Sequence, residues 1–243
     1  MTTIDVIILF LSATAAATIS GASGFGGALV LLPIVTHIVG IQAAIPILTI
    51  GQLFGNASRV YFNHSSLEWK PIVLFLITAL PLTLIGSYMF SQVNGNKIKI
   101  GVGIFLILLV IYRRLKLTNK HIENKGMLLG GGLTGFISGI AGSAGPIGAA
   151  FFLGLGLSPT AYIASEAFTA LSMHITKSFM YSKFDLIGQK EIALGLIIGV
   201  AMILGSWLGK EIINRLSQKS FIFIVEALLV VSGIQLIITG IYN

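Results

Sequence analysis

Long apolar stretches, separated by short clusters of glycine, proline, asparagine and charged residues, divide this chain into ten segments. Alternation with a period of two residues, which a membrane β-barrel would show, is missing from these segments. Since a chain in hydrocarbon must then satisfy its backbone polar groups within helices, the pattern predicts an all-α polytopic membrane bundle of about eight to ten helical segments. The segments span residues 4–20, 25–39, 42–62, 71–91, 98–112, 126–141, 145–156, 159–181, 190–209 and 219–241.

The distribution of charge supports a location in the membrane. Only 9% of the 243 residues are Asp, Glu, Lys or Arg, against about 25% in soluble domains. No such residue occurs in the 53 positions between Asp5 and Arg59 or in the 40 positions between Lys125 and Glu166. About 20 apolar residues cross one bilayer, and the mean hydropathy is +0.97. We therefore expect a multi-pass protein of the cytoplasmic membrane, with the lipid bilayer as its surroundings.

Composition also excludes several functions. The chain contains no cysteine, which rules out disulfides, thiolate metal sites and a cysteine nucleophile. The net charge of +7 comes from basic residues at the ends of apolar segments, so we expect no nucleic-acid partner. The sequence shows no metal-binding cluster, catalytic triad or HExxH motif. We expect no metal, no cofactor and no enzymatic activity.

The two halves of the chain resemble each other at a shift of about 118 residues, which predicts two structural repeats. We place them at residues 1–118 and 126–243, with a basic linker at 119–125. The linker belongs to a stretch from Arg113 to Lys125 that should be cytoplasmic by the positive-inside rule. The matched positions are Ser20–Gly27 with Ser138–Gly145, Arg59 with Lys177, and, one residue later, Gly86 and Ser87 with Gly205 and Ser206.

The relative orientation of the repeats depends on the number of crossings in each. Lys and Arg counts do not decide it, because both arrangements place ten inside and five outside. Residues 4–39 are too long for one crossing and are typical of two short helices around a glycine-rich break. This favours five elements in each half and inverted repeats, with both chain termini outside.

The glycine-rich breaks are the strongest functional feature. Glycine permits positive φ, and a helix that restarts after a break directs unpaired N–H groups and its positive dipole end towards the region between the halves. Serine hydroxyls there add donors without charge. The breaks therefore predict a site for a small anion. The candidate residues are Ser20, Gly21, Ser23, Gly24, Gly26 and Gly27 in one half, and Ser138, Gly139, Gly142, Ser143, Gly145 and Pro146 in the other.

Close helix packing is the alternative explanation for glycines spaced three or four residues apart. We prefer it for Gly130, Gly131, Gly132 and Gly135.

Two cations occupy matched positions near the ends of the third and eighth segments. Arg59 follows Asn56 by three residues, and Lys177 follows His174 by three, so each pair shares a helix face. A cation in a membrane helix is costly and usually faces water or a counter-charge. All four residues are candidates for anion binding. The alternative is that both cations extend to the membrane interface.

Glu166 lies eight residues before His174 and eleven before Lys177, which places the three on one helical stripe. A carboxylate and an imidazole in such a position can carry protons, so Glu166 and His174 are candidates for proton coupling. The alternative is a structural pair between Glu166 and Lys177. Glu226, isolated in the last segment, is a candidate intersubunit contact, which would make the protein a homo-oligomer.

Residues Gly21 to Gly27, Leu32-Pro33, Gly139 to Pro146 and Gly205-Ser206 resemble the sulfite exporter TauE/SafE family, also called toluene sulfonate uptake permeases. The resemblance covers essentially the whole chain. It implies a secondary transporter of sulfite, sulfonates or related small anions, and it allows proton coupling. Ala28, in place of a third consecutive glycine, and Pro146 depart from the family pattern and leave the anion open.

The expected function is therefore a permease that moves a small anion, such as sulfite or an organosulfonate, by alternating access around the two breaks. An anion channel or a structural membrane subunit is the alternative. Saturable flux would distinguish a carrier from a channel, and the transporter hypothesis expects Lys177→Ala to lose anion binding.

Overall fold

The computed structural model describes residues 3–90, 100, 103–104, 107–108, 110–111, 124–213, 215 and 217–242. This part of the chain is helical, which confirms the all-α prediction. A short 3₁₀ turn at His64–Ser66 follows α3. The helices are α1 (Thr3–Ser23), α2 (Gly27–Val39), α3 (Ile41–Asn63), α4 (Trp69–Met89), α6 (Asn124–Ala141), α7 (Gly145–Leu153), α8 (Pro159–Lys183), α9 (Gln189–Ile213) and α10 (Gln218–Tyr242).

Each predicted segment other than 98–112 coincides with one of these helices to within a few residues. Most of the predicted segment 98–112 and of the linker 119–125 lies outside the described residues. The same holds for Arg113, Arg114, Lys116 and Lys120 of the basic stretch.

Both predicted breaks interrupt a helix. Gly24 and Gly26, between α1 and α2, have φ values of 88° and 100°, and Gly142, between α6 and α7, has a φ of 77°. Glycine adopts this left-handed region without the steric cost of a Cβ atom. Pro146 lies in the first turn of α7, where its missing N–H is not needed by the helix.

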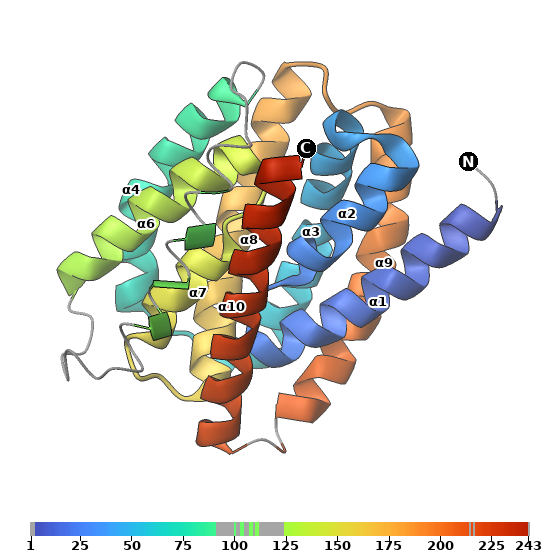
Figure 1. Ribbon diagram of the computed structural model, residues 1–243. Coiled ribbons are helices and arrows are strands. Elements are labelled where there is room, and N and C mark those ends of the chain that lie inside the picture. Colours follow the sequence, from blue (N-terminus) through green and yellow to red (C-terminus); the bar gives the residue numbers. More distant parts are fainter. Residues whose placement is uncertain are drawn as a thin grey trace.

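The helices pair across the two halves of the sequence. α4 packs along α6, and α1 packs along α9, while α3 and α8 meet in the centre (Figure 1). The first helix of each half thus packs against the fourth helix of the other half.

The buried apolar residues form two clusters. One is built from α1, α2, α3 and α9. The other is built mainly from α4, α6, α7 and α8, with Phe25 and Val110. The polar residues of the two breaks lie where these two bundles meet.

Small residues allow the paired helices to approach closely. A Cβ atom on Gly139 would lie 2.6 Å from the backbone nitrogen of Ser87 in α4, and one on Gly21 would lie 3.1 Å from the Cα atom of Gly209 in α9. A Cβ atom on Gly131 or Gly135 would overlap a carbonyl oxygen of α4. The packing interpretation is therefore confirmed for Gly131 and Gly135.

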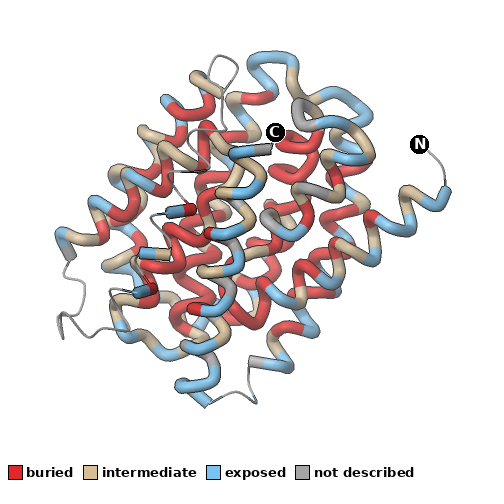
Figure 2. Tube along the Cα trace, in the orientation of Figure 1, coloured by how far each residue is buried: buried red, intermediate tan, exposed pale blue. Residues whose placement is uncertain are grey.

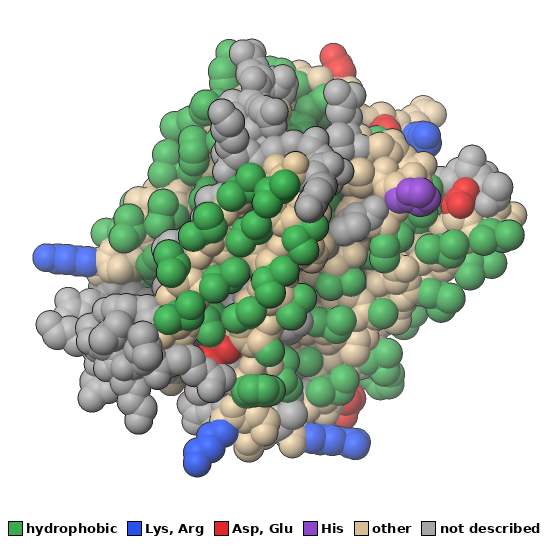
Figure 3. All heavy atoms as spheres, viewed as in Figure 1, with side chains coloured by type: hydrophobic (Ala, Val, Ile, Leu, Met, Phe, Trp, Pro, Cys, Tyr) green, Lys and Arg blue, Asp and Glu red, His purple; other side chains and the backbone are tan. Residues whose placement is uncertain are grey.

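The outer surface suits a lipid environment. Among the described residues, α1, α4 and most of α9 (Gln189–Ile212) are long and apolar enough to cross a membrane. Burial is concentrated in the centre of the bundle (Figure 2), and large hydrophobic side chains such as Ile77 and Val200 are exposed. Hydrophobic side chains are spread over the face in Figure 3, and Lys and Arg lie at its rim. Such an apolar surface is unfavourable in contact with water and favourable in contact with lipid.

Candidate functional site

A small cavity lies where the two breaks meet α3 and α8. Its volume is about 40 Å³. One water molecule needs roughly 10 to 15 Å³ on this scale, so the cavity can hold about three waters or a small ion. It is lined by Phe25, Gly26, Gly27, Ala28, Gln52, Asn56, Arg59, Ser138, Ser143, Ala144, Gly145, Glu166, Ala170, Met173 and His174.

The starts of α2 and α7 both contribute to the wall of this cavity. Gly27 and Ala28 line it from α2 and Gly145 from α7, together with Gly26 and Ala144, which directly precede these helices. Among the described residues, neither N-cap residue, Gly26 or Ala144, makes a side-chain capping hydrogen bond. The first N–H groups of a helix need partners from elsewhere, and its positive dipole end attracts anions. Both helix starts therefore border the same cavity, and their role in binding an anion stays a prediction.

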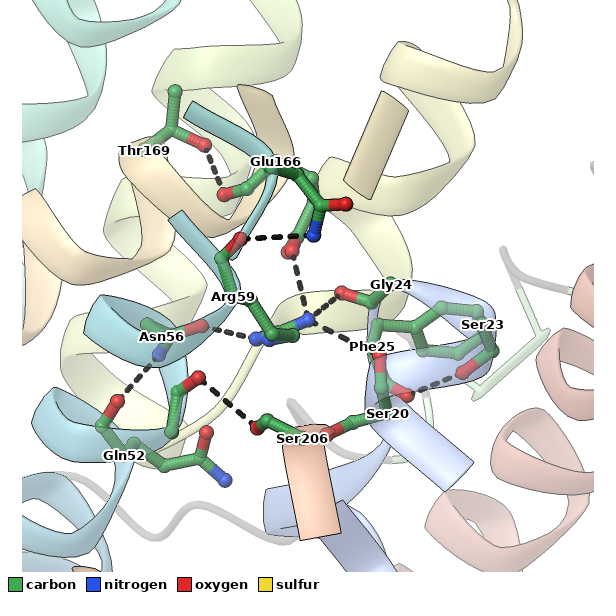
Figure 4. Close-up of polar contacts among 12 residues, drawn as sticks. Ser20, Ser23, Gly24, Phe25, Gln52, Asn56, Arg59, Glu166, Thr169 and Ser206 are labelled. Atoms are coloured by element: carbon green, nitrogen blue, oxygen red, sulfur yellow. Dashed lines mark hydrogen bonds and ion pairs between the residues drawn. The ribbon is translucent and has the colours of Figure 1, made fainter. Parts of the chain in front are cut away.

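Arg59 lies beside the cavity and is 4% exposed. Its Nη1 donates to the carbonyl oxygens of Ser20, at 3.3 Å, and of Gly24, while Nη2 donates to Oδ1 of Asn56 (Figure 4). The same Nη1 lies 3.5 Å from Oε2 of Glu166. The guanidinium thus satisfies carbonyl groups at the end of α1 and connects α3 to α8.

Lys177 performs the matching role in the second half. Its Nζ donates to Oγ of Ser138 at 3.0 Å and to the carbonyl oxygen of Gly142 at 2.9 Å. Ser138, Gly142 and Lys177 are each 118 positions after Ser20, Gly24 and Arg59. Each cation therefore attaches the end of a broken helix to the third helix of its own half.

Burial decides between the two interpretations of these cations. Lys177 is fully buried and Arg59 nearly so, so extension to the membrane interface is wrong for both. Lys177 is not among the described residues that line the cavity, and its role as an anion ligand stays a prediction.

Glu166 forms its ion pair across the interface of α3 and α8. Helical spacing placed it on one stripe with Lys177, but its charged partner is Arg59, while the Lys177 ammonium is bound to the end of α6. The predicted structural pair between Glu166 and Lys177 is therefore wrong. Oε2 of Glu166 makes no hydrogen bond within the described part of the chain.

The predicted residues differ in what their side chains contact and in whether they line the cavity. Some have their side chains committed to the backbone, as Ser20 does to the carbonyl of Ala17 and Ser23 to those of Ile19 and Phe25. Of the predicted residues, Gly26, Gly27, Asn56, Arg59, Ser138, Ser143, Gly145, Glu166 and His174 line the cavity. The predicted residues that are not among its lining residues are Ser20, Gly21, Ser23, Gly24, Gly139, Gly142, Pro146 and Lys177.

Gln52 is a cavity residue that the sequence analysis missed. It is buried in α3, one helical turn before Asn56, whose Nδ2 donates to the Gln52 carbonyl oxygen at 2.8 Å. Its spacing of four residues from Asn56 and seven from Arg59 places all three on one helix face, and this signal could have revealed it. Gln52 also lines a second cavity of about 10 Å³, mostly apolar, together with His174 and Ser143.

Glu226 in α10 is nearly inaccessible within the single chain, at 6% exposed. Its role as an intersubunit contact, and homo-oligomer formation, stay predictions.

A multi-pass helical bundle with a cavity that is lined by buried polar side chains and lies between two broken helices has the architecture of a membrane transporter. Comparison with known proteins agrees. The model of the family described as sulfite exporter TauE/SafE matches residues 9–236, and the chain belongs to this family.

Two relatives carry transporter names. The chain is 24% identical over 278 aligned positions to the probable membrane transporter protein YunE of Bacillus subtilis (strain 168), with 98% of this chain and 99% of the relative covered. It is 24% identical over 244 positions to the probable membrane transporter protein MJ0441 of Methanocaldococcus jannaschii, with 88% and 89% covered. No solved structure matches the chain.

Proposed function

We propose that this protein is a secondary transporter of a small anion such as sulfite or an organosulfonate, and that the cavity of about 40 Å³ is its binding site. The observation that carries this proposal is the meeting of two uncapped helix starts with the buried Arg59 guanidinium at one polar cavity. Oriented N–H groups and one neighbouring cation stabilise a dehydrated anion, so that a second cation is not needed. A site of this kind can bind an anion and also release it.

Proton coupling follows from the second charge at the cavity. The Glu166 carboxylate lies 3.5 Å from Nη1 of Arg59 and lines the same space. An ionised carboxylate repels an incoming anion, and in a site of low dielectric this repulsion is strong. Protonation of Glu166 removes the repulsion and leaves Arg59 available to the anion. Anion and proton should therefore bind together. His174, which lines the cavity with an Nδ1 atom that lacks a hydrogen-bond partner, is the second proton-carrying candidate.

The two bundles suggest how access alternates. One consists of α1, α2, α3 and α9 and the other of α4, α6, α7 and α8, and the cavity lies between them. Rocking of one bundle against the other would open the cavity to each side in turn, as in transporters built from repeats. The Arg59 to Glu166 contact crosses this interface, so it should form and break during the cycle.

Flux into proteoliposomes tests the proposal. Uptake of sulfite, methanesulfonate and sulfate is measured over a range of concentrations, with and without an inward proton gradient. We expect saturable uptake of one anion that rises with the gradient. Linear uptake without saturation would favour the anion channel, and the absence of flux for every anion would leave the structural subunit.

A further inference from the structure

Four buried polar groups around the cavity lack a hydrogen-bond partner in the described part of the chain. They are Nε2 of Gln52, Nε of Arg59, Oε2 of Glu166 and Nδ1 of His174. The exposed fractions of these residues are 5%, 4%, 3% and 8%, in the same order. Unpartnered polar groups are costly inside a protein and are usually rare. Other unpartnered atoms, such as Oγ1 of Thr36 and Thr83, belong to residues elsewhere in the described part of the chain. These four residues all line one cavity, which points to a ligand that satisfies them.

The chemistry of these groups describes that ligand. Nε2 of Gln52 and Nε of Arg59 can only donate hydrogen bonds, whereas an ionised Glu166 can only accept them. Nδ1 of His174 donates or accepts, depending on its tautomer. A matching ligand must therefore present acceptor oxygens to Gln52 and Arg59 and a donor to Glu166.

We infer that the cavity selects a small oxyanion carrying one O–H group, whose bare oxygens accept from Gln52 and Arg59 and whose O–H donates to Glu166. This inference rests on the proposed function and specifies its substrate class. It also fixes the number of protons in the complex, because the anion and the Glu166 carboxylate share one proton. An oxyanion without an O–H can make the same contact only when Glu166 itself takes a proton from solution. No covalent bond other than that to the proton changes.

The donor and the acceptor are both departures from the internal repeat, so repetition alone does not explain them. The position 118 residues after Gln52 is Ala170, which also lines the cavity, and the position 118 before Glu166 is Leu48, which lines the neighbouring apolar cavity. Nε2 of Gln52 lies 3.2 Å from the place where a Cβ atom on Gly27 would be, so the amide lies against the start of α2. Gln52 therefore adds a donor beside the N–H groups of that helix.

Among the described residues, few charged or titratable side chains surround Glu166. Arg59 faces it from α3. Tyr162, His174 and Lys177 share its own helix, α8, and the lining residues contributed by the α1–α2 and α6–α7 breaks include no titratable side chain. Proton uptake on binding an anion is therefore expected to occur at Glu166, with His174 as the competing site.

Titration calorimetry on the purified protein in detergent tests this inference. Hydrogen sulfite and methanesulfonate serve as probes, at a slightly acidic pH and under nitrogen, in two buffers of different ionisation enthalpy that together give the number of protons taken up. Methanesulfonate should take up one more proton per anion than hydrogen sulfite. The difference does not depend on how far free Glu166 is ionised, because both complexes hold the same single proton. In Glu166→Gln the difference should disappear.

Gln52→Met removes the proposed donor at nearly constant size. Loss of one hydrogen bond to a charged group should weaken the binding of both probes about tenfold or more, with the proton difference unchanged. Thr49→Val is the matched control, because Thr49 is a buried polar residue of the same helix that is not among the lining residues. It should bind both probes as the wild type does.

The outcomes separate this inference from the proposed function. Equal proton uptake for the two probes in the wild-type protein would overturn the inference and leave the anion site standing. Wild-type affinity in Gln52→Met would exclude Gln52 as a ligand. Failure of both probes to bind the wild-type protein would count against the proposed function itself.

Discussion

Replacing Lys177 with methionine should release the end of α6 from α8. The ammonium donates to Ser138 and Gly142 at 3.0 and 2.9 Å and is fully buried. Hydrogen bonds from a charged donor contribute about 1.5 to 3 kcal/mol each, and methionine recovers part of this because it needs no desolvation of a charge. We expect a net loss of about 3 kcal/mol in local stability at the break, which is roughly a 100-fold change in the local opening equilibrium.

Hydrogen exchange measured by mass spectrometry on peptides covering residues 138–148 checks this value. Lys177→Met should exchange there roughly 100-fold faster than the wild type, with little change in α1 and α9. Lys183→Met is the matched control, because Lys183 belongs to the same helix but is exposed. Equal protection of residues 138–148 in Lys177→Met and Lys183→Met would refute the proposed attachment of α6 to α8.

Two further predictions concern the ion pair and the glycine contacts. Arg59→Met leaves the Glu166 carboxylate buried without its partner, which costs about 3 to 5 kcal/mol of stability. The melting temperature of Arg59→Met should therefore lie below that of the double variant Arg59→Met with Glu166→Gln. A lower melting temperature for the double variant would contradict the pairing. Gly135→Ala should lower the melting temperature, because its Cβ atom would lie 2.8 Å from the Ala79 Cα atom in α4. Gly132→Ala should be tolerated, because the nearest atom to its Cβ would be the end of the Leu82 side chain, at 3.1 Å. Similar melting temperatures for these two alanine variants would show that the backbone contact is not tight.

Much of the helical framework could be predicted from the sequence because the helices and the two breaks coincide with local signals. Apolar runs define the helices, and glycines at positions 24, 26 and 142 mark the breaks, since they adopt positive φ. The shift of 118 residues also predicted which residues would play equivalent roles, and Arg59 and Lys177 do contact matched helix ends.

The partners of the buried charges could not be predicted in the same way. Helical periodicity relates residues of one helix, and it placed Glu166 with Lys177, whereas the ion pair is formed with Arg59 on a different helix. The packing of α3 against α8 sets this arrangement, and no local pattern encodes it. Gln52 was missed because an uncharged amide within an apolar segment resembles an ordinary helix residue until its burial and its unpartnered nitrogen are known.

Filling the cavity tests the central claim most directly. Ala170 lines the cavity from α8, and Ala170→Met would place a longer apolar side chain in the space proposed for the anion, while Ala170→Ser keeps that space open. Sulfite uptake into proteoliposomes is compared for the wild type and both variants, after their melting temperatures show that all three are folded. We expect saturable uptake in the wild type and in Ala170→Ser, and its loss in Ala170→Met. Undiminished saturable uptake by folded Ala170→Met would contradict the assignment of this cavity as the anion site.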